Sequence, residues 1–131
     1  MTQEQFVAVI KQVVFDPAVS EMVLQPAGRE PHQVLVRMWD WYTGLPGPDK
    51  AMVQHAMRIA AYGAIFHFFA ALDGSAAIDD PPHGQLRLTY LTLGGGEVPL
   101  NLTGQVSVPD VDELHALWTG EVFPYTEPLP G

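Results

Sequence analysis

One helical segment, residues 48–72, most constrains how this chain can fold. Four of its polar side chains recur every four positions, and most of its other residues are apolar and rich in alanine. A period of four places the polar residues on one narrow stripe of an α-helix, while the alanines let neighbouring helices approach closely. We therefore predict a central helix that exposes this polar stripe to solvent and buries its other sides. The stripe consists of Lys50, Gln54, Arg58 and Tyr62.

Shorter helical segments precede the central helix. Thr2 and Gln5 have the spacing of a capping box, and Asp16 followed by Pro17 is typical of a second helix start. A third helix is expected to end at the glycine- and proline-rich residues 44–48. Its apolar residues are spaced to face the core, and they are Val34, Leu35, Met38, Trp41 and Tyr42. The first helix is expected to bury one apolar stripe, made of Phe6, Val9, Ile10, Val13 and Val14.

The period of the sequence pattern changes after Gly74. Apolar and polar residues alternate over residues 86–90 and again over residues 98–102, and three glycines at 94–96 separate the two runs. Alternation on both sides of a glycine turn is typical of a β-hairpin. The hairpin is predicted over residues 85–103.

The fold predicted from these elements is a single α+β domain, residues 1–131. A last helix is expected over residues 109–119, and an extended, proline-rich tail over residues 121–131. About four N-terminal helices, with the helix at 48–72 in the centre, would pack against the C-terminal hairpin and helix. Neither a linker nor an internal repeat indicates a second domain.

Composition and charge exclude several classes of protein. Six Lys and Arg against 15 Asp and Glu give a formal net charge of −9, which opposes nucleic-acid binding through a basic surface. With no cysteine, the chain has no disulfide, no thiolate metal site and no cysteine nucleophile. The longest apolar run, residues 59–72, has 14 residues, whereas a membrane span needs about 20. We expect a cytoplasmic protein that binds no cofactor, no nucleic acid and no membrane.

Candidate catalytic groups fall in two places. Asp79, Asp80 and His83 share a proline-rich loop, where two carboxylates and an imidazole could hold a divalent metal. Asp112 and His115 lie three positions apart in the last predicted helix. Neither place shows the several converging polar groups that catalysis needs. We therefore expect no enzyme, no metal and no catalytic residue. The alternative is a metal-assisted hydrolase that uses the loop residues and His115.

Three aromatic side chains of the helical half, Trp39, Trp41 and Tyr42, could lie either in the core or at a binding surface. On a helix, Trp39 and Tyr42 share one face, whereas Trp41 points elsewhere. Trp and Tyr dominate the energetic centres of protein interfaces, so one of these three is a candidate anchor.

His67 lies within the apolar run of the central helix and is expected to be a core histidine with a hydrogen-bonded ring.

Negative charge is concentrated in the second part of the chain. Residues 1–72 have five cations and six anions, a net charge of −1, whereas residues 73–131 have one cation and nine anions, a net charge of −8. An acidic surface of this kind would steer a basic protein partner by electrostatic attraction. The residues expected to contact that partner are Asp79, Asp80, Glu97, Asp110, Asp112 and Glu113, with Trp118 and Tyr125 as candidate aromatic anchors. The spacing of Trp118 in the last predicted helix is equally consistent with a place in the core.

Four short segments between residues 41 and 118 carry a resemblance to known proteins. They are Trp-Tyr-Thr-Gly-Leu-Pro at 41–46, residues 66–74 ending in Leu-Asp-Gly, Leu-Arg-Leu-Thr-Tyr at 86–90 and Leu-His-Ala-Leu-Trp at 114–118. These segments resemble a group of small, acidic bacterial proteins of unknown function, some of which are similar to immunity proteins of polymorphic-toxin systems. The resemblance implies an inhibitor that neutralises a toxin, and it assigns no catalytic residue.

The function expected from the sequence is therefore non-enzymatic. We expect an acidic binding protein, and specifically an immunity-type inhibitor of a basic toxin or enzyme. A self-associating structural module remains as a further alternative, because helices rich in apolar residues and poor in charge allow a homodimer.

Overall fold

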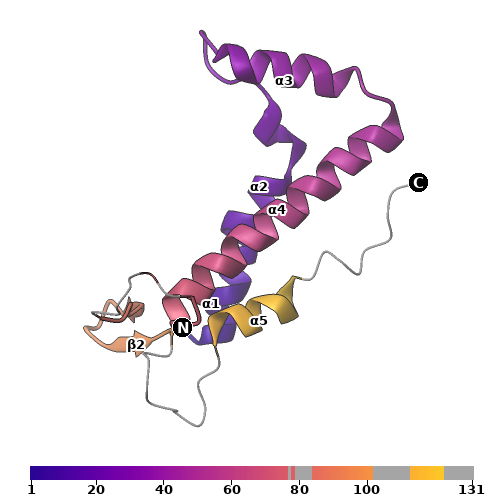
Figure 1. Cartoon of the computed structure of the whole chain (residues 1–131). Coiled ribbons are helices and arrows are strands. Elements are labelled where there is room, and N and C mark those ends of the chain that lie inside the picture. The colour runs from indigo at the N-terminus through magenta and orange to yellow at the C-terminus, as the bar shows by residue number, and fades with distance from the viewer. Residues whose placement is uncertain (77, 79–83, 102–112, 123–131) are drawn as a thin grey trace.

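The computed structural model describes residues 1–76, 78, 84–101 and 113–122. The described chain is helical up to the end of α4 and then forms a two-stranded hairpin and a last helix (Figure 1). The predicted α+β fold is confirmed. In chain order the elements are α1 (Gln3–Ile10), η1 (Lys11–Phe15), α2 (Asp16–Val19), η2 (Glu21–Leu24), α3 (Gln33–Thr43), α4 (Gly47–Asp73), β1 (Thr89–Leu91), β2 (Glu97–Pro99) and α5 (Leu114–Glu121).

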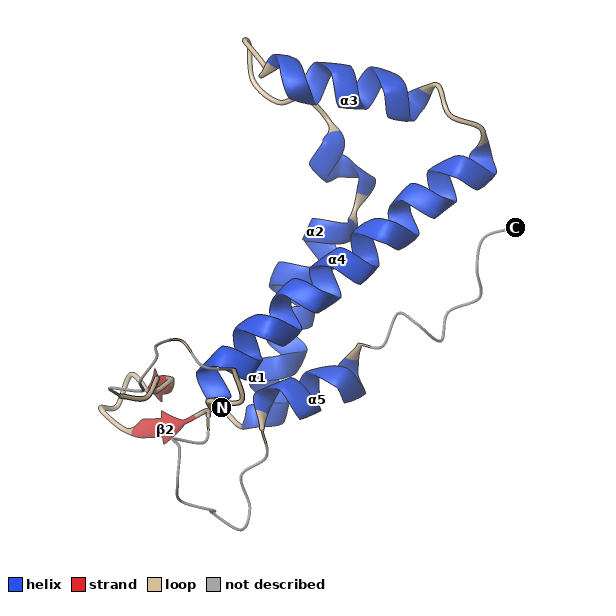
Figure 2. Cartoon of the chain, in the orientation of Figure 1, coloured by secondary structure: helices blue, strands red, loops and turns tan. Residues whose placement is uncertain are grey.

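The helix α4 forms the long axis of the molecule (Figure 2). It has 27 residues, which gives a length of about 40 Å at ~1.5 Å per residue. Its bounds agree with the predicted helix 48–72 because local signals set both ends. Pro48 lies in the first turn, and Gly74 ends the helix in the left-handed conformation, with φ of 79°. Among the described residues, no helix is both long and apolar enough to cross a membrane.

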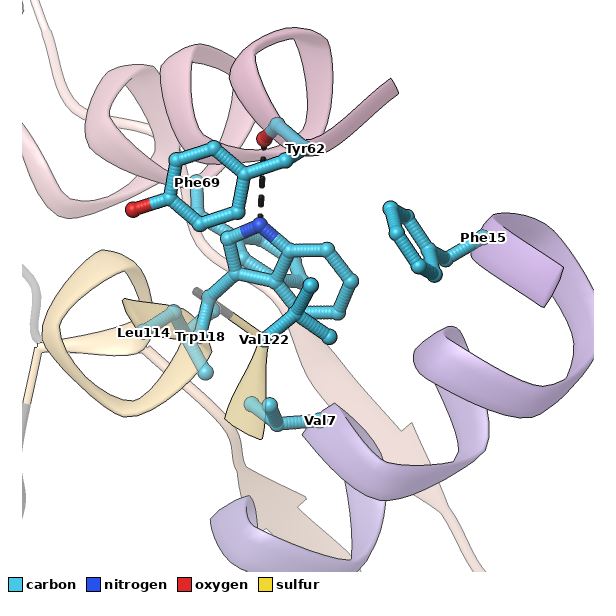
Figure 3. Close-up of a cluster of buried hydrophobic side chains, with 7 residues drawn as sticks. All are labelled: Val7, Phe15, Tyr62, Phe69, Leu114, Trp118 and Val122. Carbon is cyan, nitrogen blue, oxygen red and sulfur yellow. Dashed lines mark hydrogen bonds between the residues drawn. The ribbon is translucent and has the colours of Figure 1, made fainter. Parts of the chain in front are cut away.

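The hydrophobic core lies where the C-terminal half of α4 meets α5 and the N-terminal helices (Figure 3). Trp118 of α5 is at its centre and is 0% exposed. The ring centroids of Phe15, Tyr62 and Phe69 lie 5.6, 6.2 and 6.1 Å from that of Trp118. The indole Nε1 donates a hydrogen bond to the backbone oxygen of Tyr62 at 3.1 Å. A single side chain thus joins α5 to α4 and η1.

The apolar stripe predicted for the first helix is confirmed only at Phe6 and Ile10, which pack against the core. Val9, Val13 and Val14 are exposed, and Val7 and Phe15 are buried instead. The helical run changes from α-helix to π-helix at Lys11. A π turn takes up one residue more than an α turn, so the residues after it rotate around the helix axis. This rotation brings Phe15 into the core that Val7 enters. The capping box at the start of α1 is confirmed.

The helix α3 lies at the end of α4 that is remote from the hairpin and α5 (Figure 1). Tyr42 is buried and attaches the C-terminal end of α3 to the rest of the chain. The phenol of Tyr42 donates to Glu21 Oε2 at 2.9 Å and accepts from Gln54 Nε2 at 2.6 Å. Lys50 Nζ lies 5.8 Å from the centre of the Tyr42 ring, as a cation–π contact.

Burial raises the pKa of Tyr42, and the neighbouring Glu21 carboxylate adds to this effect against the opposing hydrogen bond from Gln54. The folded state therefore favours the neutral phenol. The stability that the Tyr42 phenol contributes is present below pH ~10, where the phenol is also protonated in the unfolded chain. This stability is lost as the pH rises through the higher pKa of the phenol in the folded chain. The urea concentration at the midpoint of unfolding should fall for the unmodified chain between pH 9 and about 11.5. In Tyr42→Phe this fall should be smaller, because the variant has no phenol to ionise at this position. Tyr90→Phe, at an exposed ring, is the control, and identical profiles for both variants would contradict the assignment.

The hairpin lies within the predicted residues 85–103, and each strand has three residues. The strands pair antiparallel, with Tyr90 opposite Val98. Gly95 has φ of 88° in the turn between them, a conformation that favours glycine. The buried side chain of Asn101 fixes the hairpin to α4, because its Nδ2 donates to the backbone oxygens of Leu72 and Leu86 at 2.6 and 2.9 Å.

The last helix is displaced from its predicted bounds of 109–119. Glu113 has extended backbone angles, so α5 begins at Leu114, and the helix continues through Gly120 to Glu121. Residue 121, predicted as the first residue of an extended tail, is therefore helical. Residues 109–112 and 123–131 lie outside the described residues.

Candidate functional site

The structure describes three of the eight residues predicted to contact a partner. Glu97 is exposed on β2, and the side chain of Glu113 is 48% exposed just before α5. Trp118 is fully buried, so it packs in the core and the prediction of an exposed anchor at this position is corrected. The others lie outside the described residues: Asp79, Asp80, Asp110, Asp112 and Tyr125.

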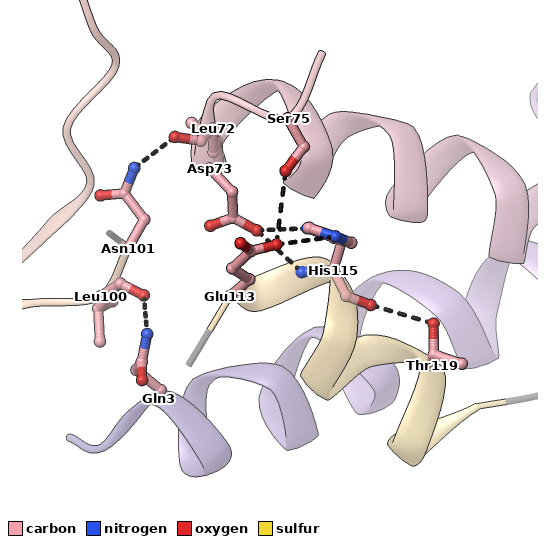
Figure 4. A network of polar contacts seen from close by, with 9 residues as sticks. All are labelled: Gln3, Leu72, Asp73, Ser75, Leu100, Asn101, Glu113, His115 and Thr119. Carbon is pink, nitrogen blue, oxygen red and sulfur yellow. Dashed lines mark hydrogen bonds and ion pairs between the residues drawn. The ribbon is translucent and has the colours of Figure 1, made fainter. Parts of the chain in front are cut away.

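His115 lies between two carboxylates where α4 ends and α5 begins (Figure 4). Its Nδ1 is 2.9 Å from Asp73 Oδ2, and its Nε2 is 3.0 Å from Glu113 Oε2. Ser75 Oγ donates to the same Glu113 oxygen at 3.4 Å. Carboxylate oxygens face both ring nitrogens, so the imidazolium form can donate to both of them. Both nitrogens of His115 are therefore occupied within the chain.

Asp73 also caps α5 from a different helix. Its Oδ2 accepts a hydrogen bond from the backbone N–H of His115 at 3.0 Å, one of the donors in the first turn that has no partner within its own helix. A negative carboxylate at this end of α5 also interacts favourably with the helix dipole. The side chain of Asp73 is 0% exposed, and its Oδ1 has no hydrogen-bond partner among the described residues. The network thus holds α5 against the end of α4.

The hydrolase alternative gains no support from the described part of the site. Catalytic zinc sites use three protein ligands that point at one position. In the described ranges, no group of three or more His, Asp or Glu is placed to hold a metal ion. His115 is engaged by Asp73 and Glu113, and Asp79, Asp80 and His83 lie outside those ranges.

The sequence did not indicate three buried polar residues that organise this end of the molecule. They are Gln3, Asp73 and Asn101. Gln3 Nε2 donates to the backbone oxygen of Leu100 at 2.9 Å, a residue 97 positions away. Asp73 and His115 are 42 positions apart. Neither helical nor strand periodicity detects pairs this distant, and the only local signal at Asp73 was the helix end at Gly74.

Exposed apolar side chains form one face of α3. Val34, Met38 and Trp41 are 55%, 41% and 57% exposed, so the prediction that these three residues face the core is wrong. Their spacing of four and then three residues places them on the same side of the helix. Trp39 and Tyr42 occupy a different side, with ring centroids 5.9 Å apart, so the predicted separation of Trp41 from these two rings is confirmed. We call Val34, Met38 and Trp41 the α3 apolar face.

A second apolar surface lies on α4 and reverses the predicted orientation of this helix. The polar stripe predicted to face solvent is turned inward: Tyr62 is buried, and the Arg58 guanidinium lies 5.3 Å from the centre of the Phe15 ring. His67, predicted to be in the core, is exposed. From Asp49 onward, the exposed residues of α4 are Asp49, Met52, Ala56, Ala60, Ala64, His67 and Phe68.

The fold and these surfaces define a small α+β protein with two exposed apolar helix faces. The chain matches no protein-family model, no curated protein and no solved structure.

Proposed function

We propose that this chain is a non-enzymatic acidic binding protein that inhibits a basic protein partner, in the manner of an immunity protein. The observation that best supports this function is the α3 apolar face. A soluble chain rarely leaves large apolar side chains contiguous and exposed unless the surface binds something. Trp41 is the candidate anchor of this surface, because tryptophan is enriched among residues that dominate binding energy.

The size of the expected contribution follows from the area that Trp41 would bury. An aromatic side chain buries roughly 150–250 Å² when enclosed. Trp41 is 57% exposed, so a partner would remove roughly 100 Å² of it from water. At ~25 cal/mol per Å² this burial is worth about 2–3 kcal/mol, or a factor of roughly 30–150 in affinity.

The charge of the chain supports a basic partner. The net charge is −9, with −8 in residues 73–131. Three of the anions in that part are exposed on described elements, namely Glu97, Glu113 and Glu121. Enzymes that act on polyanions are basic around their sites, so an acidic chain gains association rate through electrostatic steering, while apolar anchors supply affinity.

The test is association with the protein encoded by the neighbouring open reading frame. We expect the two proteins to bind, and Trp41→Ser to weaken binding roughly 30–150-fold, mainly through faster dissociation. Leu91→Ser is the control, since Leu91 is equally exposed but lies on β1. An acidic neighbour, an absence of binding, or equal affinities for the two variants would overturn the proposal.

Electrostatic steering is tested separately through the association rate constant. The variant Glu97→Lys combined with Glu121→Lys is expected to slow association, and the difference from the unmodified chain should shrink at high salt. Exposed charges are screened beyond about 8 Å at physiological ionic strength, so the effect depends on salt. An association rate that is unchanged by this reversal at low salt would contradict a basic partner.

A further inference from the structure

We propose that the outer side of α4 is the contact surface of a homodimer in which two copies of α4 pack antiparallel, with Ala60 at the two-fold axis. We define the α4 outer face as the exposed residues Asp49, Met52, Ala56, Ala60, Ala64, His67 and Phe68. This surface is different from the α3 apolar face, so the inference does not depend on the proposed function.

The α4 outer face is continuous and mostly apolar. Five of its residues follow one another at intervals of four, from Met52 to Phe68. At about 100° per residue, the whole set lies within roughly half of the helix circumference. The solvent-facing side of a surface helix normally carries charged residues. On the α4 outer face, Asp49 and His67 are the only polar residues.

The order of side-chain sizes along this face is the same in both directions. The large residues Met52 and Phe68 lie at equal distances from Ala60, and alanines occupy the positions between them. In an antiparallel pair centred on Ala60, Met52 of one copy therefore faces Phe68 of the other. Small residues meet at the axis, where two helix backbones come closest. A two-fold interface requires such self-complementarity, and this face has it.

The two polar residues favour the antiparallel arrangement over the parallel one. With Ala60 on the axis, Asp49 of one copy comes about one helical turn from His67 of the other. The carboxylate can then accept a hydrogen bond or an ion pair from the imidazole, twice by symmetry. A parallel pair in register would instead place Asp49 beside Asp49 of the second copy, where like charges repel.

Gly63 adds an independent observation. Glycine disfavours a helix relative to alanine, so its presence in the middle of α4 calls for a packing reason. Within the described chain, no atom other than the helix backbone nearby lies within 4 Å of the position that a Cβ on Gly63 would take. Gly63 lies one turn from Ala60 along this side of α4, and its missing Cβ lets the backbone of the second copy approach closely.

The area available predicts a weak dimer. A helix about 10 Å across that covers half of its circumference over residues 49–71 offers roughly 500 Å² per copy, near the lower limit for a specific interface. The dimer is therefore expected in the micromolar range or weaker. Sedimentation should show monomer and dimer in a concentration-dependent equilibrium, and Ala60→Glu should shift it at least tenfold towards monomer without changing the circular dichroism spectrum.

Disulfide mapping tests the geometry directly, because the chain contains no cysteine. Ala60→Cys is expected to form a covalent dimer on mild oxidation. Met52→Cys and Phe68→Cys should each stay monomeric alone, since equal positions would be roughly 24 Å apart, well beyond the ~4.4–6.8 Å that a disulfide allows between Cα atoms. A mixture of these two variants should form the covalent heterodimer.

The outcomes that overturn the proposal are equally specific. Leu91→Cys, exposed on β1, is the control for random collision and should link much more slowly than Ala60→Cys. Covalent dimers of Met52→Cys alone and Phe68→Cys alone would indicate a parallel pair and overturn the antiparallel geometry. A chain that remains monomeric in sedimentation up to about 1 mM would overturn the dimer itself.

Discussion

Replacing Trp118 with alanine is expected to lower the free energy of unfolding by about 3–5 kcal/mol. The side chain is fully buried, and its ring contacts three other aromatic rings from η1 and α4. Truncation would leave a cavity between α5, α4 and η1. It would also leave the Tyr62 backbone oxygen without its indole donor, at 3.1 Å in the intact chain. A single domain typically has only about 5–15 kcal/mol of stability, so the loss is large.

Urea denaturation followed by far-ultraviolet circular dichroism measures this effect. Trp41→Ala is the matched control, because it removes the same side chain from an exposed position and should change stability by no more than about 0.5 kcal/mol. Equal losses of stability in the two variants would show that Trp118 is not at the centre of the core.

Replacing Asp73 with alanine is the second large effect, an expected loss of about 2–3 kcal/mol. The change removes the acceptor of two hydrogen bonds, from the backbone N–H and the ring Nδ1 of His115. The N–H would then lie at the first turn of α5 without a partner, which costs more than the bond itself contributes. Because Asp73 and His115 join α4 to α5, the loss should weaken the docking of α5 in particular.

Glu113→Gln provides the control for this prediction. Glu113 contacts the other nitrogen of His115, but its side chain is 48% exposed, so the expected loss is below about 1 kcal/mol. Hydrogen exchange should show faster exchange in α5 for Asp73→Ala and little change for Glu113→Gln. The reverse order would mean that the exposed carboxylate, rather than the buried one, holds α5.

The bounds of α4 and the position of the hairpin could be predicted because local residues determine them. Pro48 and Gly74 mark the ends of the helix, and the glycines before Glu97 mark the turn. The start of α5 differs from its predicted position because the local signal there is misleading. Acidic residues before Leu114 are typical of a first helical turn, whereas Glu113 is extended and the capping carboxylate comes from Asp73.

The direction in which α4 faces could not be predicted from its pattern. Polar residues every four positions normally mark the solvent side, but Arg58 contacts the ring of Phe15 and Gln54 binds the phenol of Tyr42. Both partners belong to other helices: Arg58 lies over an aromatic ring, and Gln54 donates to a hydroxyl oxygen, at partly buried positions. The same inversion leaves the alanines and Phe68 exposed. Which side of α4 is buried depends on contacts with other helices, and the period of the sequence does not encode these contacts.

Within the described residues, the predicted partner-binding site keeps its exposed carboxylates but loses its aromatic anchor. Glu97 and Glu113 are exposed, whereas the burial of Trp118 removes it from the surface. The α3 apolar face replaces Trp118 as the source of an aromatic anchor. Its signal was present in the spacing of Val34, Met38 and Trp41, but the same spacing is also typical of a helix side that packs in a core.

The central claim, that Trp41 anchors a protein partner, is tested most directly by ¹⁹F NMR of the chain labelled with 5-fluorotryptophan. The fluorine of Trp41 should show a solvent isotope shift between H₂O and D₂O in the free chain, and that of buried Trp118 should show none. Trp41→Phe assigns the signal. On saturation with the protein from the neighbouring open reading frame, the isotope shift of Trp41 is expected to disappear. A saturated complex in which this shift is unchanged would contradict it.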